Sequence, residues 1–194
     1  MNIIKIGDIT VKPLKTKNWY DFETLFGPKG AYGGCWCMWW RISRKEFEEG
    51  QGQKNHNAMK AIVDSGTIPG LIAYKDDQPC GWCSVAPREH YTSLERSRVL
   101  KRIDDQPVWS MVCFFINKNY RGMGIGEKLI LGSIEFVKSQ NGKIIEAYPT
   151  NIYKENMSPV STFTGIPKIF EKLGFKEISR PSKSKIIMRY YINS

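Results

Sequence analysis

The stretch VWSMVCFFINKNYRGMGIGEK, residues 108–128, decides which fold is expected for this chain. An apolar run over residues 108–116 ends in a short polar turn, and Arg121 with the glycines after it leads straight into an amphipathic pattern. Glycine lets the backbone approach a ligand closely, and the first N–H groups of a helix have no acceptor within that helix. A strand, a glycine-rich turn and a helix N-terminus in this order predict a binding site for a phosphorylated ligand.

The glycine spacing excludes two well-known phosphate loops. A dinucleotide fingerprint, G-x-G-x-x-G, would place its third glycine at Glu127. A P-loop needs Lys and then Ser or Thr directly after its last glycine, and the sequence after Gly126 does not provide them. The spacing present is R-x-x-G-x-G, made by Arg121, Gly124 and Gly126. The alternative, a glycine-rich turn without a ligand, is disfavoured because strand, turn and helix follow in the required order.

This R-x-x-G-x-G spacing resembles the acyl-CoA pyrophosphate loop of the GNAT N-acetyltransferase superfamily. In that family the loop follows the fourth strand and opens the third helix. A second passage, IFEKLGFKEISR at residues 169–180, resembles the family's passage from the last helix into a strand. The resemblance covers about residues 68–192 and implies a GNAT-like acyl-CoA N-acyltransferase fold.

The order of periodic segments predicts an α/β fold with a mixed sheet flanked by helices, in a single domain over residues 1–194. Strands are expected at residues 3–13, 70–75, 80–85, 108–116, 143–148, 175–178 and 185–192, and helices at residues 16–27, 43–50, 57–65, 126–139 and 162–173. Residues 68–192 are expected to form the acyl-CoA-binding core. By the resemblance, residues 1–67 are expected to shape the site of the acceptor.

The composition favours a cytoplasmic protein with no membrane partner. No apolar run is long enough to span a bilayer, and the N-terminus alternates as a strand does instead of resembling a signal peptide. The net charge of +10 suits a polyanionic ligand such as CoA, a nucleic acid or a membrane surface. No block of Lys and Arg with interleaved aromatic residues stands out, so nucleic acid is not favoured as a partner.

The cysteine pattern invites a zinc site, which we do not expect. Cys80 and Cys83 fall in a predicted strand, where residues three apart point to opposite faces. Cys35 and Cys37 flank a tryptophan instead of the two-residue turn of a zinc knuckle. The sequence therefore predicts reduced thiols and no metal.

The resemblance also implies which residues hold acetyl-CoA, the expected cosubstrate. The backbone of the strand would pair with the pantetheine amides, and the turn would bind the pyrophosphate through its N–H groups. The strand residues are Phe114, Phe115 and Ile116, and the turn residues are Arg121, Gly122, Met123, Gly124, Ile125 and Gly126. Arg121 could act through its charge or brace the loop, and both interpretations stay open.

The catalytic residues are less clearly indicated. Glu146 lies on the strand beside the expected opening, where the family often places a carboxylate or an ordered water, so it is the candidate general base. The alternative is a surface glutamate between core-facing neighbours. Tyr148 could hydrogen-bond the substrate or the thiolate. Many members of the family have a Tyr near the CoA sulfur as the general acid, and Phe170 stands at that position here. The general acid is therefore unidentified, and water, Tyr148 or Tyr153 are candidates.

Two segments are candidates for the acceptor pocket. Aromatic faces attract cations, and an amine arrives as a cation, so the aromatic cluster of Trp36, Met38, Trp39 and Trp40 could face the acceptor. The interpretation that these are core residues is favoured. Residues 89–105 are the second candidate wall.

The function expected is acetyl-CoA-dependent transfer of an acetyl group to a primary amine of a small molecule or peptide, by direct attack on the thioester. A non-catalytic acyl-CoA-binding module is an alternative that the Phe170 departure supports, and a basic nucleic-acid-binding protein is one that rests on charge alone. The acceptor, the length of the acyl group and a homodimer are left open.

Overall fold

The computed structural model describes residues 3–151 and 163–192, which form one mixed sheet in the order β1-β2-β3-β4-β5-β6-β8-β7. Neighbouring strands are antiparallel except for β5 and β6, which run parallel. The strands are β1 (Ile4–Ile6), β2 (Ile9–Pro13), β3 (Leu71–Lys75), β4 (Gln78–Pro87), β5 (Trp109–Ile116), β6 (Ile144–Ala147), β7 (Lys176–Ser179) and β8 (Ile187–Tyr191).

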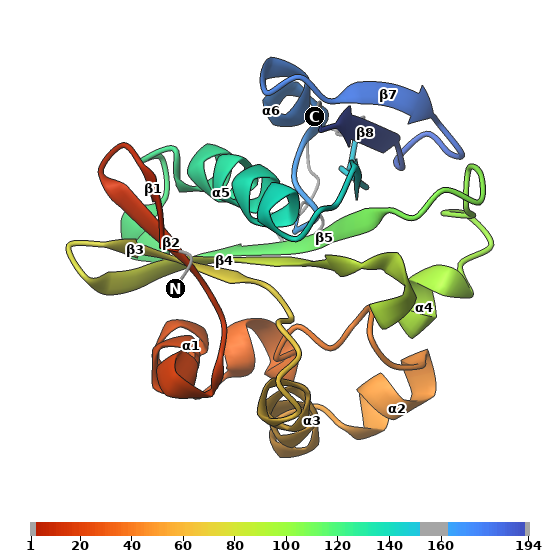
Figure 1. Ribbon diagram of the computed structural model, residues 1–194. Coiled ribbons are helices and arrows are strands. Elements are labelled where there is room, and N and C mark those ends of the chain that lie inside the picture. Colours follow the sequence, from red (N-terminus) through yellow and green to blue (C-terminus); the bar gives the residue numbers. More distant parts are fainter. Residues whose placement is uncertain (1–2, 152–162, 193–194) are drawn as a thin grey trace.

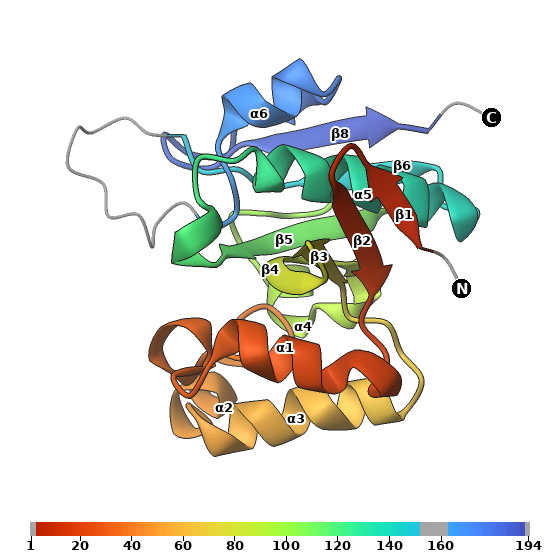
Figure 2. The same ribbon diagram turned by 90° about the vertical axis from the view of Figure 1, so that its left-hand side faces the viewer.

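Helices cover both faces of this sheet. α5 packs against β1–β5 on one face, and α1, α2 and α3 form a layer on the opposite face (Figures 1 and 2). The helices are α1 (Trp19–Phe26), α2 (Arg44–Glu49), α3 (Gln53–Asp64), α4 (Thr92–Glu95), α5 (Ile125–Ser139) and α6 (Pro167–Lys172). Short turns of other helical types are η1 (Thr16–Asn18), η2 (Gly30–Gly34), η3 (Arg88–His90) and η4 (Lys118–Tyr120). In the part of the chain that the structure describes, no helix has the length and apolar character needed to cross a bilayer.

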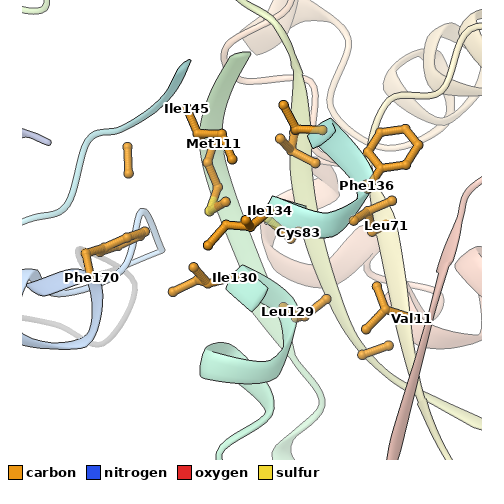
Figure 3. Packing of buried hydrophobic residues seen from close by; sticks show 14 of the residues in the cluster. Val11, Leu71, Cys83, Met111, Leu129, Ile130, Ile134, Phe136, Ile145 and Phe170 are labelled. Atoms are coloured by element: carbon orange, nitrogen blue, oxygen red, sulfur yellow. The ribbon is translucent and has the colours of Figure 1, made fainter. Parts of the chain in front are cut away.

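The main core lies between α5 and the sheet (Figure 3). Ile130 and Ile134 of α5 pack in the same core as Leu71 of β3 and Met111 of β5, as their spacing of four residues predicts. A second core lies on the other face, where Phe22 of α1 joins other buried aromatic side chains. The alternation along β3 and β4 sends side chains to both cores, so these strands are covered on their two faces.

The prediction of a single continuous strand at the N-terminus is wrong. Residues 3–13 form two antiparallel strands, β1 and β2, joined at Gly7 and Asp8. Gly7 has φ 61°, which glycine adopts without steric cost. The Asp8 carboxylate in this turn pairs with Lys75 of β3, at 2.7 Å, and with Lys128 of α5. The N-terminal hairpin is thereby held to both layers.

The expectation that Cys80 and Cys83 point to opposite faces is also wrong. The register shifts between Ala73 and Tyr74 because β4 carries an extra residue there, Cys80. A β-bulge changes the alternation, so both cysteines pack in the core under α5. No described group of three or more His, Cys, Asp or Glu side chains is arranged to hold a metal ion.

Candidate active site

The neighbouring strands β5 and β6 diverge and leave one edge of β5 without a strand partner. β5 pairs with β6 only over Trp109–Met111, and then continues to Ile116. Beyond Met111, the Phe114 N–H donates to the Phe163 carbonyl at 2.6 Å. The Ile116 carbonyl accepts from the Arg121 side chain at 3.4 Å. Phe114 and Ile116 therefore present their backbone to the opening. Phe115, between them, presents its backbone to β4.

The glycine-rich turn connects this edge to α5. Gly122 and Gly124 have φ 79° and 70°, a region that favours glycine. Helical hydrogen bonding begins with the Lys128 N–H, which donates to the Gly124 carbonyl at 3.2 Å. The N–H groups of Ile125, Gly126 and Glu127 therefore have no acceptor within the helix. A helix of 15 residues also places a partial positive charge at this end.

Open space surrounds the glycines of this turn. A Cβ atom built on Gly122, Gly124 or Gly126 would meet no atom within 4 Å. Arg121 and Met123 are exposed, whereas Ile125 is buried in the core and has only its backbone to offer a ligand. The loop predicted to bind phosphates is thus an accessible cradle of N–H groups.

Several cations near the turn are already paired. Lys128 pairs with Asp8, and Lys172 of α6 pairs with Glu127 at 2.8 Å. Arg121 makes its backbone contact through Nε, which is the bracing geometry considered above. The attraction of the turn for an anion therefore depends first on the helix N-terminus.

Phe170 is a core residue. Its ring is fully buried, 6.1 Å from the ring of Phe114 and 5.1 Å from that of Phe175. A Cβ on Gly165 would lie 2.6 Å from it, so the packing there is close. Phe170 holds α6 against β5 and has no proton to donate. Tyr153 lies outside the described residues.

Glu146 is buried in an ion-pair cluster on the side of β6. It is 1% exposed, so the surface alternative is wrong. Its oxygens accept from Arg189 Nε at 2.8 Å, from Arg88 Nη1 at 3.2 Å and from the Tyr148 hydroxyl at 2.7 Å. These three donors occupy both carboxylate oxygens, and none of them belongs to an open site. The geometry favours a structural role over the predicted role of base.

Tyr148 belongs to the same cluster. Its buried hydroxyl donates to Glu146, lies 2.8 Å from the Ser110 hydroxyl and accepts from Arg88 Nη1 at 3.0 Å. Burial, and then the charge of Glu146, raise the pKa of Tyr148 well above its ordinary value. Neither Tyr148 nor Glu146 lines the cavity described below. The structure brings the two predicted catalytic residues together, but not at an open site.

The outer members of this cluster were missed from the sequence. Arg88 also pairs with Glu95 at 2.6 Å, and Arg189 pairs with Asp104 at 2.7 Å. These bonds tie the segment after β4 to β6 and β8. One sign of this cluster is visible in the sequence, namely an acidic residue, Glu146, within an apolar strand. The two arginines that pair with it lie far from it along the chain.

A cavity of about 360 Å³ lies between β5 and the N-terminal helical layer. It is lined by Phe26, Ala31, Tyr32, Gly33, Cys35, Cys37, Trp39, Trp40, Phe47, Gln51, Cys113, Phe114, Phe115 and Phe163. The aromatic cluster predicted from the sequence divides here. Trp36 and Met38 are core residues, whereas Trp39 and Trp40 line the cavity. None of the residues 89–105 is among the lining residues, so the second predicted wall is not found.

Thiols form part of the cavity wall. Cys37 accepts from the Trp82 indole N–H at 3.2 Å. Hydrogen bonding from Cys113, with the charge of Arg41 and the Trp82 contact, lowers the pKa of the Cys37 thiol, while that of Cys113 is raised. Burial raises the pKa of Cys35 to about 11.

Comparison with known proteins identifies the class. The family model described as the Acetyltransferase (GNAT) family matches residues 36–157, more than half of the chain. The chain belongs to this family, and its enzyme class is N-acetyltransferase. This confirms the resemblance seen in the glycine-rich turn, and the mixed α/β fold is the one predicted. No curated protein sequence matches the chain.

Solved structures of acetyltransferases share the fold. The PaiA N-acetyltransferase from Thermoplasma acidophilum, in complex with coenzyme A, is 16% identical over 95% of this chain and 99% of that chain, with a TM-score of 0.53. A GNAT-family acetyltransferase from Streptococcus agalactiae is 12% identical over 100% of both chains, with a TM-score of 0.58. A chain of the NatC complex bound to Gag peptide and CoA is 13% identical over 96% and 99%, with a TM-score of 0.54. At these identities the likeness concerns the fold alone.

Proposed function

We propose that this protein transfers an acetyl group from acetyl-CoA to a primary amine of a small molecule or peptide, by direct attack of the amine on the thioester. One observation carries the proposal. The edge of β5 that has no strand partner beyond Met111 runs into an open glycine-rich turn at the N-terminus of α5, beside a cavity that touches Cys113, Phe114 and Phe115.

Each part of acetyl-CoA has a place in this arrangement. The pyrophosphate would accept from the N–H groups at the start of α5, where the helix dipole favours an anion. The pantetheine would lie along the open edge of β5, at Phe114 and Ile116. The thioester would then reach the cavity, where an amine could approach it. Holding both reactants close together and correctly oriented is the main contribution to catalysis that this arrangement offers.

The proton of the amine has no described carboxylate or imidazole to receive it in the cavity. In the reaction the C–N bond forms, the C–S bond breaks, the amine proton passes to water, and CoA leaves as a thiolate. A thiol with a pKa of about 8.5 makes a fair leaving group without an acid. We therefore expect kcat/KM to rise with pH as the free amine fraction grows, toward an amine pKa of about 10. Initial rates at saturating acetyl-CoA from pH 6 to 10 measure this, and a bell-shaped profile centred near neutrality would point to a side-chain acid and base.

Calorimetric titration with acetyl-CoA, followed by an assay of amine-dependent thiol release, tests the function. Micromolar binding that weakens modestly at higher salt, with thiol release for at least one amine, is the expected result. Binding without release for any amine would favour the non-catalytic module. No detectable binding would overturn the assignment of the glycine-rich turn.

A further inference from the structure

The cavity beside β5 is unusual in carrying no charged side chain among its described lining residues. Its wall consists of aromatic rings, thiols and small residues, and its neutral polar groups are the Tyr32 hydroxyl, the Gln51 amide and the indole N–H groups of Trp39 and Trp40. Trp39 and Phe47 meet edge to face at 5.0 Å, so the rings at this wall are packed against each other. A pocket of this composition favours apolar surface.

We propose that the acceptor is a monoamine whose amino group is carried by one compact aromatic or branched apolar group. This inference rests on the proposed function and names the substrate class of the same site. The cavity volume of about 360 Å³ suits a molecule of one or two rings. A single ammonium can lie against the faces of aromatic rings before it loses its proton.

Polycationic acceptors are disfavoured by the charges around the cavity. The guanidinium of Arg44 lies 5.5 Å from the centre of the Trp39 ring. Arg41, which follows Trp40 in the sequence, is buried. The three acids of α2 are engaged: Glu48 pairs with Arg44 at 2.8 Å, Glu49 lies 4.0 Å from Lys45, and Glu46 caps the helix through Ser43. A second ammonium on the acceptor would lose water here and meet no described carboxylate at the wall.

The first test compares acceptors. Thiol release is measured with 2-phenylethylamine, isopentylamine, spermidine and a short lysine-rich peptide, each at saturating acetyl-CoA. We expect kcat/KM for the two apolar monoamines to exceed that for spermidine and the peptide by about tenfold or more. Equal or better use of spermidine or the peptide would overturn the inference and leave the proposed function standing.

A matched pair of variants ties the preference to the cavity. Tyr32 and Tyr20 are both exposed, at 67% and 77%, but only Tyr32 lines the cavity. Tyr32→Ala is expected to raise KM for 2-phenylethylamine about fivefold and to leave acetyl-CoA affinity unchanged. Tyr20→Ala should change neither quantity. Identical kinetics for the two variants would contradict the placement of the acceptor.

Direct binding separates failure of this inference from failure of the proposed function. Trp39 and Trp40 line the cavity, so 2-phenylethylamine should quench tryptophan fluorescence saturably, and more weakly in Tyr32→Ala. This result would stand even if acetyl-CoA did not bind. Absence of saturable quenching by either apolar monoamine, together with absence of their acetylation, would overturn the inference.

Discussion

At the scale of single residues, the ion-pair cluster around Glu146 shows how the surroundings of a carboxylate decide its chemistry. A glutamate on a central strand could be a base or a brace. Here it meets Arg88 and Arg189, which are themselves almost fully buried. Both of its oxygens are bonded to these side chains and to Tyr148, so the carboxylate acts as a brace between strands.

Substitution of Glu146 by Gln should therefore act on stability. Removing one member of a buried ion pair leaves the partner charge uncompensated, and the expected loss in the free energy of unfolding is about 3 kcal/mol. Urea denaturation of the two proteins measures it. Unchanged stability with a lower turnover and a shifted pH profile would instead restore the role of base.

The residue scale also marks a limit of the sequence. The sequence alone indicates that Glu146 is an unusual residue, because it is a charged side chain within an apolar strand. The sequence does not show Arg88 and Arg189 closing on it, since these contacts span 58 and 43 residues. The division of Trp36 from Trp39 is equally hidden, because it depends on the rings packed around each of them.

At the scale of elements, the turn between β5 and α5 was predictable because its signals are local. An apolar strand, glycines with positive φ and an amphipathic helix all lie within residues 108–139. The helix was expected from residue 126 and begins at Ile125. The helix expected at residues 43–50 is α2, and a capping box of Ser43 and Glu46 opens it. The bulge at Cys80 was not predictable, because a bulge depends on the partner strand.

Gly124→Glu tests the function of this turn. Gly124 has φ 70° and open space around it, so a side chain there adds some backbone strain and a negative charge at the phosphate site. We expect acetyl-CoA binding to be lost in calorimetry while the protein stays folded by circular dichroism. Gly66→Glu is the matched control, since Gly66 has φ 84° and open space but lies after α3. Equal affinity in the two variants would show that the turn is not the phosphate site.

At the scale of the whole molecule, ion pairs between distant segments connect the layers. Asp104 in the segment between α4 and β5 binds Arg189 of β8 through both of its oxygens, at 2.7 and 2.9 Å. Hydrogen bonding from Arg189 lowers the pKa of Asp104 to about 2. The folded state therefore holds the ionised form more strongly than the unfolded chain does.

This pair predicts a pH dependence of stability. A depressed folded-state pKa contributes stability above the unfolded value of about 3.9, and that contribution is lost as the pH falls toward about 2. Asp104→Asn should lower Tm at pH 7, and its difference from the wild type should shrink to near zero at the acidic end. Thermal unfolding of both proteins across this range measures it. A difference that did not vary with pH would mean that the charge of Asp104 is unimportant.

The hydrogen bond from Phe114 to Phe163 has a consequence for how affinity is divided along the cofactor. A pantetheine carbonyl arriving at the Phe114 N–H would replace the Phe163 carbonyl, which already lies at 2.6 Å. One hydrogen bond between amide groups is exchanged for another, and such an exchange gains little net free energy. The nucleotide end should therefore carry most of the affinity. We expect 3′-phosphoadenosine diphosphate to bind almost as tightly as CoA, and pantetheine alone to bind weakly, in competition calorimetry.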